Sequence, residues 1–417
     1  MIAASAAAPT WIIAGVSTAG VIVRPWRLPE AVWAVGGAVL LVASGLLPWH
    51  QALLAIGKGT DVYLFLLGMM LLSEVARREG LFDWLAVFAV RHSRGSATRL
   101  FLLVYGVGTI VTAFLSNDAT AVVLTPAVFA ATRAAKADPL PYLFICAFIA
   151  NAASFILPIS NPANLVLYGN HMPALMAWLA DFLLPATVCV LVTLGTLLLV
   201  EWRGLRAPIA AEIPHAELPF GGKVAAAGIL ATAVVLLAAS GADVPLGLPT
   251  ALAGVVTTAV VLAAKREAPW ETLRGVSWLV LPLVAGLFVL VQGLAATGVV
   301  AGIADLLHHA SEVSTASTAW GAGVLLALLC NVMNNLPAGL IAGSAVAAAH
   351  VPRVVTNALL VGVDLGPNLS ITGSLATILW LTALRREGEE VSFTKFLLRG
   401  AIVMPPALLA ALASLMV

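Results

Sequence analysis

Long apolar stretches follow one another along the whole chain, with only short charged segments between them. Of the 417 residues, 61% are hydrophobic and 10% are charged, and the mean hydropathy of +1.04 is far above that of a soluble globular domain. A helix needs roughly 20 apolar residues to cross a bilayer, and several stretches reach that length. The sequence therefore predicts an all-α integral membrane protein without a sizeable soluble domain.

Four stretches depart from the pattern of simple spans. Those at about 100–132 and about 319–350 are each interrupted by a polar tip, and neither half reaches the length of a full span. We interpret both as re-entrant hairpins. The stretches at about 140–168 and about 354–384 are too long for one straight span and contain Pro, Asn or Gly near the middle, so we predict two discontinuous transmembrane helices.

The basic residues predict how the chain is oriented, because cytoplasmic loops carry an excess of Lys and Arg. If the N-terminus is outside and both hairpins re-enter, all of the 21 lysines and arginines except Lys58 and Arg353 lie on the cytoplasmic side. This arrangement has about ten full spans and also places the C-terminus outside. The first hairpin then opens to the cytoplasm and the second opens to the outside.

The chain also repeats itself, with offsets between 212 and 219 residues. The corresponding positions are 30 and 249, 61 and 276, 117 and 334, and 161 and 373. Since the first copy starts from the inside and the second from the outside, we predict an inverted-topology repeat. Residues 1–222 would hold a leading helix and the first repeat, and residues 223–417 a leading helix and the second repeat. Amphipathic stretches at 80–95 and 299–311 are predicted to be interfacial helices that link a moving domain to a fixed one.

Polar residues at the two tips and the two breaks form the candidate substrate site. A helix broken within the membrane turns free backbone groups toward a shared cavity, and neutral amides and hydroxyls add hydrogen-bonding groups at little desolvation cost. Such a site suits a small polyhydroxylated solute or a dehydrated cation. The candidate substrate-binding residues are Asn117, Ser160, Asn161, Asn164, Asn334, Asn335, Thr372, Gly373 and Ser374.

Two acidic residues are candidates for proton coupling. Asp118 lies at the first tip, where an ionisable group is costly unless it is hydrated, paired or protonated. The alternative is that Asp118 only caps the helix that follows it. Asp364 precedes the second break and is either a second carrier or a local partner of Asn368. Asn151 occupies the corresponding place in the first repeat, and a neutral amide there argues against a simple relay of two acids.

Other functions find little support in the sequence. The chain has no Gly-rich phosphate loop, no HExxH and no pairing of a nucleophile with a base, so we predict neither an enzyme nor a cofactor. None of the histidines looks like a metal ligand, and the isolated cysteines Cys146, Cys189 and Cys330 are predicted to be buried thiols. The formal net charge of +1 gives no reason to expect nucleic acid as a partner.

Three motifs resemble the signatures of ArsB-type arsenite efflux permeases, which belong to the ion transporter superfamily. They are Phe114-Leu-Ser-Asn-Asp-Ala-Thr-Ala-Val-Val-Leu-Thr-Pro126, Asn334-Asn335-Leu336-Pro337 and Asp364-Leu-Gly-Pro-Asn-Leu-Ser-Ile-Thr-Gly-Ser-Leu-Ala-Thr-Ile-Leu-Trp380. The chain departs from the best-known branch near Asn151, where that branch has an acid. The resemblance implies export of arsenite and antimonite in exchange for protons across the inner (plasma) membrane. It also implies a soluble ATPase subunit in some systems, and a homodimer is compatible with the sequence.

The hydrogen-bonding inventory of the tips agrees with arsenite, because trivalent arsenic is an uncharged trihydroxide at neutral pH and needs no fixed counter-charge. One alternative is a sodium- or proton-coupled transporter of small carboxylates or of another inorganic solute. No basic residue lies at either tip to meet a carboxylate, although helix N-termini could replace it. An ion channel or a structural membrane subunit is the alternative from another class, and a channel would need a continuous open pore.

Overall fold

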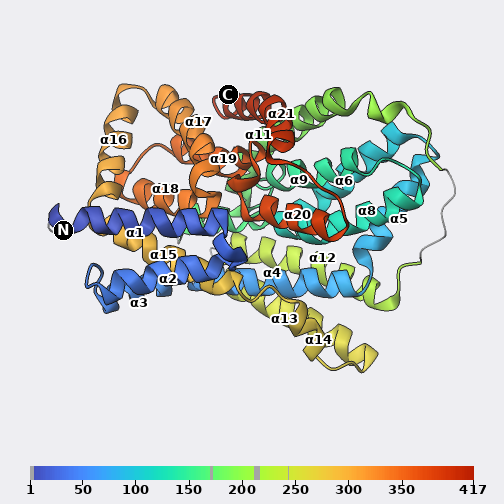
Figure 1. The fold of residues 1–417 in the computed structure, drawn as a ribbon, viewed down its shortest axis with the longest axis horizontal. Coiled ribbons are helices and arrows are strands. Elements are labelled where there is room, and N and C mark those ends of the chain that lie inside the picture. The colour runs from blue at the N-terminus through green and yellow to red at the C-terminus, as the bar shows by residue number, and fades with distance from the viewer. Residues whose placement is uncertain (1–3, 170–171, 211–216, 243) are drawn as a thin grey trace.

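The computed structural model describes residues 4–169, 172–210, 217–242 and 244–417 and is built from helices (Figure 1). Within those ranges, the strand-like pairing consists of one isolated bridge between Ser96 and Pro208. The prediction of an all-α fold is therefore confirmed. The α-helices of the first half are α1 Ala4–Val23, α2 Glu30–Ala43, α3 Trp49–Lys58, α4 Thr60–Arg78, α5 Leu81–Ser93, α6 Ala97–Phe114, α7 Asn117–Ala119, α8 Thr125–Ala134, α9 Leu140–Ala152, α10 Pro162–Tyr168 and α11 Leu175–Glu201. The next helix, α12, begins at Phe220.

The second half of the chain repeats the order of the first half. Its helices are α12 Phe220–Gly241, α13 Gly247–Lys265, α14 Trp270–Gly275, α15 Val280–Ala296, α16 Val299–Val313, α17 Thr315–Met333, α18 Asn335–Ala349, α19 Arg353–Leu365, α20 Leu375–Arg386 and α21 Phe393–Ser414. In each half a two-armed hairpin is followed by a helix that is broken near its middle. The hairpins are α6 with α7 and α8, and α17 with α18; the broken helices are α9 with α10, and α19 with α20. The boundary between residues 222 and 223 stays a prediction.

The two hairpins lie toward opposite ends of the molecule. In Figure 1, α6 and α8 are in the right half, next to α5, whereas α17 and α18 are in the left half, next to α16. This is the arrangement that an inverted-topology repeat requires. The short linking helices α5 and α16 each pack against the hairpin of their own half, at the positions where the sequence predicted amphipathic helices.

The first arm of each hairpin is longer than the sequence analysis predicted. α6 has 18 residues and α17 has 19, and both are long and apolar enough to cross a membrane. The reason lies in two N-caps upstream of the predicted starts. The hydroxyl of Ser96 accepts a hydrogen bond from the N–H of Arg99, and that of Ser314 accepts one from the N–H of Ser317. The prediction that neither half reaches a spanning length was therefore wrong for these two arms.

Six described helices meet the length and hydropathy of a membrane span, namely α6, α11, α12, α13, α17 and α21. Two bent pairs raise the number to as many as 8: α3 with α4, bent by 48°, and α15 with α16, bent by 73°. This is fewer than the ten spans predicted, because α2 and the separate halves of the broken helices are too short when each is taken alone. The chain is a multi-pass membrane protein.

The helices form two layers, which we name here by their contents. The scaffold layer contains α1–α4 and α12–α15, in which α4 packs against α13 and α2 against α15. The hairpin layer contains α6–α11 and α17–α21, in which α17 packs against α19 and α11 against α21. Figure 1 shows the scaffold layer below the hairpin layer. Within the scaffold, Gly68 and Gly254 let α4 and α13 approach closely, because a Cβ on either would meet the backbone of the other helix.

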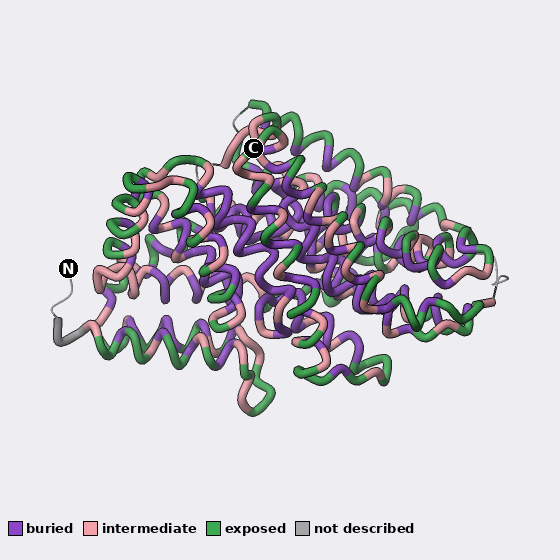
Figure 2. The backbone as a smooth tube through the Cα atoms, turned by 90° about the horizontal axis from the view of Figure 1, so that it is seen from above, coloured by how far each residue is buried: buried purple, intermediate pink, exposed green. Residues whose placement is uncertain are grey.

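The broken helices occupy the centre of the hairpin layer. Every residue from Val355 to Leu365 in α19 is buried, and so is every residue from Pro141 to Ala152 in α9. Exposed positions instead lie around the outside of the backbone (Figure 2). The apolar residues among the exposed ones include Leu191, Leu230 and Val256. A bilayer would cover this outer surface, so the polar residues of the breaks lie inside protein and away from lipid.

Candidate functional site

The tip of the first hairpin is a turn that Ser116 closes. Its hydroxyl accepts a hydrogen bond from the N–H of Ala119 at 3.1 Å, so Ser116 is the N-cap of the second arm. The hydroxyls of Thr112 and Thr120 join the two arms across 2.8 Å. Capping of this arm is therefore the role of Ser116, and the alternative reading of Asp118 as the N-cap was wrong.

The side chain of Asp118 points from this tip into the interior cavities of the protein. Its N–H donates to Oδ1 of Asn117 at 2.9 Å, while its carboxylate has neither a hydrogen bond nor an ion pair in the part of the chain that the structure describes. The side chain lines both of the cavities described below. The carboxylate is therefore accessible to whatever fills them.

The tip of the second hairpin is built around Asn334. This residue has φ of +72°, a backbone conformation that Asn tolerates better than most residues, and its Oδ1 accepts from the N–H of Leu336 at 3.3 Å. Asn335 is the first residue of the second arm, as Asn117 is in the first hairpin. The two tips thus present an asparagine at the same structural position, one from each repeat.

The first helix break is closed by hydrogen bonds from its own asparagines and serine. Asn161 caps α10 by accepting from the N–H of Ala163 at 3.0 Å, and Ser160 donates to the carbonyl of Ala113 at 3.0 Å. The amide nitrogen of Asn164 faces three backbone carbonyls of the break, and one of them, that of Leu157, also accepts from the N–H of Ser160 at 3.1 Å. It donates to Ser154, Pro158 and Leu157 at 2.9, 3.2 and 3.4 Å. Asn164 therefore satisfies carbonyls that would otherwise need a donor or a cation.

The second helix break is held in a similar way. Ser374 caps α20 by accepting from the N–H of Thr377 at 3.1 Å, and Thr372 donates its hydroxyl to the carbonyl of Asn331 at 2.9 Å. Asn331 in turn donates its amide to the carbonyl of Gly366 at 3.0 Å. Gly373 lies so close to Pro367 that a Cβ there would meet the proline backbone. These residues fix the backbone of the break.

Both tips and the first break meet at a small cavity of about 10 Å³. Asn117 and Asp118 reach it from the first hairpin, Asn335 from the second hairpin and Asn161 from the first break. Such a volume holds about one water molecule. Among the described residues that line it, the polar side chains are three neutral amides and one carboxylate, and none is basic. The innermost part of the site therefore offers hydrogen-bonding groups around a single acid.

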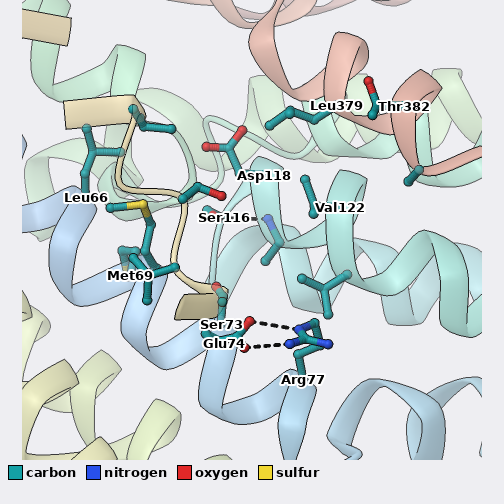
Figure 3. A pocket seen from close by; sticks show the side chains of 18 of the residues that line it. Leu66, Met69, Ser73, Glu74, Arg77, Ser116, Asp118, Val122, Leu379 and Thr382 are labelled. Atoms are coloured by element: carbon teal, nitrogen blue, oxygen red, sulfur yellow. Dashed lines mark hydrogen bonds and ion pairs between the residues drawn. The ribbon is translucent and has the colours of Figure 1, made fainter. Parts of the chain in front are cut away.

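A larger cavity of about 630 Å³ continues from the small one. Four residues line both cavities: Leu66, Asp118, Pro162 and Val280. In Figure 3, Asp118 lies between Leu66 and Met69 of α4 on one side and Leu379 and Thr382 of α20 on the other. The cavity thus lies between the two layers, with a scaffold helix as one wall.

The residues of that scaffold wall were missed by the sequence analysis. Met69, Met70 and Ser73 of α4 all line the larger cavity. The sequence holds one signal for them, a serine and an acid, Ser73 and Glu74, inside a span that is otherwise apolar. A single acid near the end of an apolar span is also typical of an interfacial residue, so this signal alone does not connect α4 with the site.

Charged residues surround the outer end of the larger cavity. Glu74 and Arg77 form a two-point ion pair with distances of 2.6 and 2.8 Å (Figure 3). Arg274 of α14 and Arg386 of α20 also line the cavity, together with Glu387. All three arginines belong to the set that the basic-residue pattern places in the cytoplasm, so the cavity opens toward the predicted cytoplasmic side.

The structure brings four of the predicted site residues together at the small cavity, namely Asn117, Asp118, Asn161 and Asn335. The other candidates line neither cavity and hydrogen-bond or pack against the backbone of the tips and breaks. They are Ser160, Asn164, Asn334, Thr372, Gly373 and Ser374. A role in substrate binding stays a prediction for all of the nine neutral residues.

Asp364 lies away from both cavities and is fully buried. Its Oδ1 accepts a hydrogen bond from Nδ2 of Asn161 at 2.8 Å, whereas its Oδ2 has no hydrogen-bond partner among the described residues. The partner that the sequence analysis considered, Asn368, instead bonds to Asn151 at 3.0 Å. Through Asn161, Asp364 is one residue away from the cavity that Asp118 lines.

The thiols do not reach the cavities. Cys146, Cys189 and Cys330 are free and buried, and the thiol of Cys330 points to the carbonyl of Val363 at 3.9 Å. Within the described ranges, no group of three or more His, Cys, Asp or Glu side chains could hold a metal ion. The chemistry of the cavities therefore comes from amides, hydroxyls, Asp118 and the charges at the outer end.

Comparison with known proteins agrees with this architecture. The chain is 28% identical over 364 residues to an arsenical pump membrane protein of Yersinia enterocolitica, which covers 84% of both chains. It is 27% identical over 393 residues to an arsenical pump membrane protein of Escherichia coli, covering 91% of both. An uncharacterized transporter of Mycobacterium tuberculosis is 27% identical over 402 residues, or 92% of both chains.

Two solved structures share the fold. The YdaH transporter of Alcanivorax borkumensis, described as having an unusual topology, has a TM-score of 0.55 at 15% identity and covers 88% of this chain and 86% of its own. MtrF of Neisseria gonorrhoeae has a TM-score of 0.53 at 13% identity, covering 90% of this chain and 83% of its own. A family model described as a citrate transporter, CitMHS, matches residues 11–384. The chain is therefore a membrane transporter that belongs to the CitMHS family and resembles the arsenical pump membrane proteins.

Proposed function

We propose that the protein is a secondary active transporter that exports arsenite and antimonite in exchange for protons across the inner (plasma) membrane. One observation carries the proposal: three neutral amides from both hairpins and the first break meet around one carboxylate, with no basic side chain beside them. The arsenical pump membrane proteins that resemble the chain support this choice of substrate.

The chemistry of the solute matches these groups. Arsenite is a neutral trihydroxide at neutral pH, so its three hydroxyls both donate and accept hydrogen bonds. The amides of Asn117, Asn161 and Asn335 provide donors and acceptors in return. A fixed cation would add nothing for a neutral solute and would cost desolvation energy at this depth. Export requires release as well as binding, and hydrogen bonds release a ligand more readily than a pair of thiolates would.

Proton coupling is assigned first to Asp118. It is the acid that borders both the small cavity and the larger one, so it can exchange a proton with the larger cavity and also meet a solute that reaches the tips. In the proposed cycle, Asp118 alternates between a protonated state and a state competent for substrate. Sodium is a weaker candidate because the amide of Asn164 already donates to the backbone carbonyls of the first break.

The movement that exposes the site to either side is assigned to the hairpin layer. The larger cavity lies between α4 of the scaffold and the first hairpin with α20, so sliding the hairpin layer along α4 would close it. With both termini outside, as the basic residues predict, this structure has the cavity open to the cytoplasm. A cytoplasmic opening is the state in which an exporter loads its substrate. Homodimerisation and a soluble ATPase subunit are further proposals that the family resemblance supports.

A second candidate is transport of a small carboxylate coupled to sodium or protons. The matching family model is described as a citrate transporter, and Arg274 and Arg386 line the larger cavity without an ion pair among the described residues. Cations at the outer end of the cavity would attract an anion. The innermost cavity, however, has no basic residue to hold one, which is why arsenite is preferred.

The experiment uses everted membrane vesicles or proteoliposomes with an acidic lumen. Wild type, Asp118→Asn and the control Asp305→Asn are compared, since Asp305 is an exposed acid on α16, away from both cavities. We expect arsenite to accumulate in wild type and in the control but not in Asp118→Asn. Asp118→Asn that still exchanges protons for arsenite would disprove the role of Asp118. No arsenite flux in wild type under a proton or a sodium gradient would disprove the substrate, and citrate is the next solute to test.

A further inference from the structure

The two broken helices cross in the centre of the hairpin layer and are joined by two related hydrogen bonds. Asn161, the N-cap of α10, donates to Oδ1 of Asp364 on α19 at 2.8 Å. Ser374, the N-cap of α20, donates to Oδ1 of Asn151 on α9 at 3.3 Å. The four residues are related by one offset, since 364 − 151 and 374 − 161 both equal 213. Each repeat therefore uses the N-cap of its second half-helix to hold a side chain on the first half-helix of the other repeat.

The two halves of this crossing differ in one respect. On one side, Asn151 has both ends of its amide satisfied, because Oδ1 accepts from Ser374 and Nδ2 donates to Asn368 at 3.0 Å. On the other side, Asp364 has one bonded oxygen, and its buried Oδ2 is without a partner in the described ranges. A buried carboxylate oxygen without a donor is costly, and binding a proton removes the charge. The carboxylate of Asp364 is therefore the group at this crossing that would gain most from binding a proton.

Among the described residues, no basic side chain faces Asp364 as a counter-charge. Ser154 from the first break and Asn161 from α10 are the hydrogen-bonding side chains that face the carboxylate. The titratable groups within electrostatic range are two thiols, Cys330 on α17 and Cys189 on α11. A proton is therefore the simplest charge-neutralising ligand for this position, and Ser154 can accept a hydrogen bond from the protonated acid.

Asn161 connects this crossing with the substrate cavity. Its Nδ2 binds Asp364, its Oδ1 caps α10 at Ala163, and its side chain lines the small cavity beside Asp118. A hydrogen bond to a charged carboxylate is about twice as strong as one to a neutral acid. Protonation of Asp364 would therefore loosen the hold on Asn161 and on the start of α10.

We propose that the helix crossing is a proton-binding site separate from the substrate cavity, with Asp364 as the titrating group and Asn161 as the positioning residue that transmits its state to the cavity. Position 151 is the mirror image of this site and takes over its role when the acid is moved there. The transport consequence rests on the function proposed above, whereas proton binding itself does not. The two can therefore be tested separately.

The first test measures proton binding without any substrate. Infrared difference spectra of the purified protein are recorded between acidic and alkaline pH, in the region of the protonated carboxyl stretch. We expect a buried carboxyl band in wild type and in Asp118→Asn, no such band in Asp364→Asn, and a restored band in the exchange variant Asn151→Asp/Asp364→Asn. Ser154→Ala removes one hydroxyl that faces the carboxylate and should shift the midpoint of the band. A spectrum unchanged by Asp364→Asn, or a midpoint unchanged by Ser154→Ala, would overturn the proposal even if the exchange variant failed to fold.

The second test measures coupling in proteoliposomes with an imposed pH gradient. We expect Asp364→Asn to reduce gradient-driven arsenite flux by about tenfold, a typical size for the coupling between two sites, and the exchange variant to recover most of it. A folded exchange variant that regains neither the band nor the flux would contradict the mirror relation. If wild type carries no arsenite but shows the carboxyl band, the proposed substrate fails and the proton site stands.

Discussion

Asn164 donates a hydrogen bond to the backbone carbonyl of Ser154 at 2.9 Å, from one side of a helix break to the other. The same amide also faces the carbonyls of Leu157 and Pro158. One neutral side chain thus satisfies a set of oxygens that resembles the ligand set of a cation. Two consequences for the stability of the break can be measured.

The substitution Asn164→Ala should destabilise the protein by about 1–3 kcal/mol, because the buried carbonyls of Ser154 and Pro158 lose their donor. Asn164→Asp replaces the amide nitrogen by an oxygen that faces the three carbonyl oxygens, so this variant should be less stable than Asn164→Ala. Sodium should raise the melting temperature of Asn164→Asp, because the four oxygens can then bind the cation. Thermal unfolding in detergent, with sodium or choline as the salt, measures both the loss of stability in each variant and the effect of sodium on its melting temperature. A melting temperature of Asn164→Asp that does not respond to sodium would show that these carbonyls cannot act as a cation site.

Ser116 and Asp118 should separate into a structural and a functional role. Ser116→Ala removes the N-cap of the second arm and should cost about 1 kcal/mol of stability. Asp118→Asn removes no hydrogen bond and should change stability by no more than about 0.5 kcal/mol. Melting temperatures measured beside proton-coupled flux test the pair. An Asp118→Asn protein that melts well below Ser116→Ala would mean that Asp118 supports the fold after all.

The contact between α18 and α10 should not tolerate a side chain at Gly343. A Cβ there would meet the carbonyl of Leu167, so Gly343→Val must push the second hairpin away from the first broken helix. We expect a loss of about 1–3 kcal/mol of stability and slower transport. Gly321→Val is the matched control, since Gly321 of α17 faces open space. Equal melting temperatures for the two variants would contradict the close approach.

The arginines at the outer end of the larger cavity distinguish the two candidate substrates. Neutral arsenite gains nothing from a positive field, so Arg274→Gln and Arg386→Gln should leave arsenite flux within about twofold of wild type. Flux of an anion such as citrate should instead fall, and fall most at low ionic strength. Initial rates of arsenite and citrate transport, measured at two salt concentrations, decide between the two candidate substrates. Strong loss of arsenite flux in both variants would show that the cations act on the solute itself.

Much of the architecture could be predicted from the sequence, because membrane folds constrain it strongly. An Asn-rich tip inside an apolar pair and a proline or glycine inside a long span leave few alternatives to a hairpin and a broken helix. The positions of Asn117 and Asn335 followed from that pattern, and the structure places both beside one small cavity. The prediction failed at Ser96 and Ser314, where a single hydroxyl extends each arm by capping it upstream of the apolar stretch.

The rest of the site depended on packing that no local pattern contains. Met69 and Met70 are apolar residues in an apolar helix, and only the position of α4 across the cavity from the first hairpin makes them a cavity wall. In the same way, Ser160, Asn164 and Thr372 carry the residue types of a binding site, yet their hydrogen bonds go to backbone carbonyls. Residue type could identify the region but could not separate the groups that face a solute from those that support the turn.

The narrow space between the two hairpin tips also has a bioenergetic meaning. A passage of about 10 Å³ beside a vestibule of about 630 Å³ admits about one water molecule at its inner end, while the outer end stays open. The larger cavity can therefore hold water or solute while the narrow inner cavity prevents ions from crossing the membrane. For the proton-coupled exporter proposed above, this means that a cell with many copies of the protein would keep its proton-motive force between transport cycles.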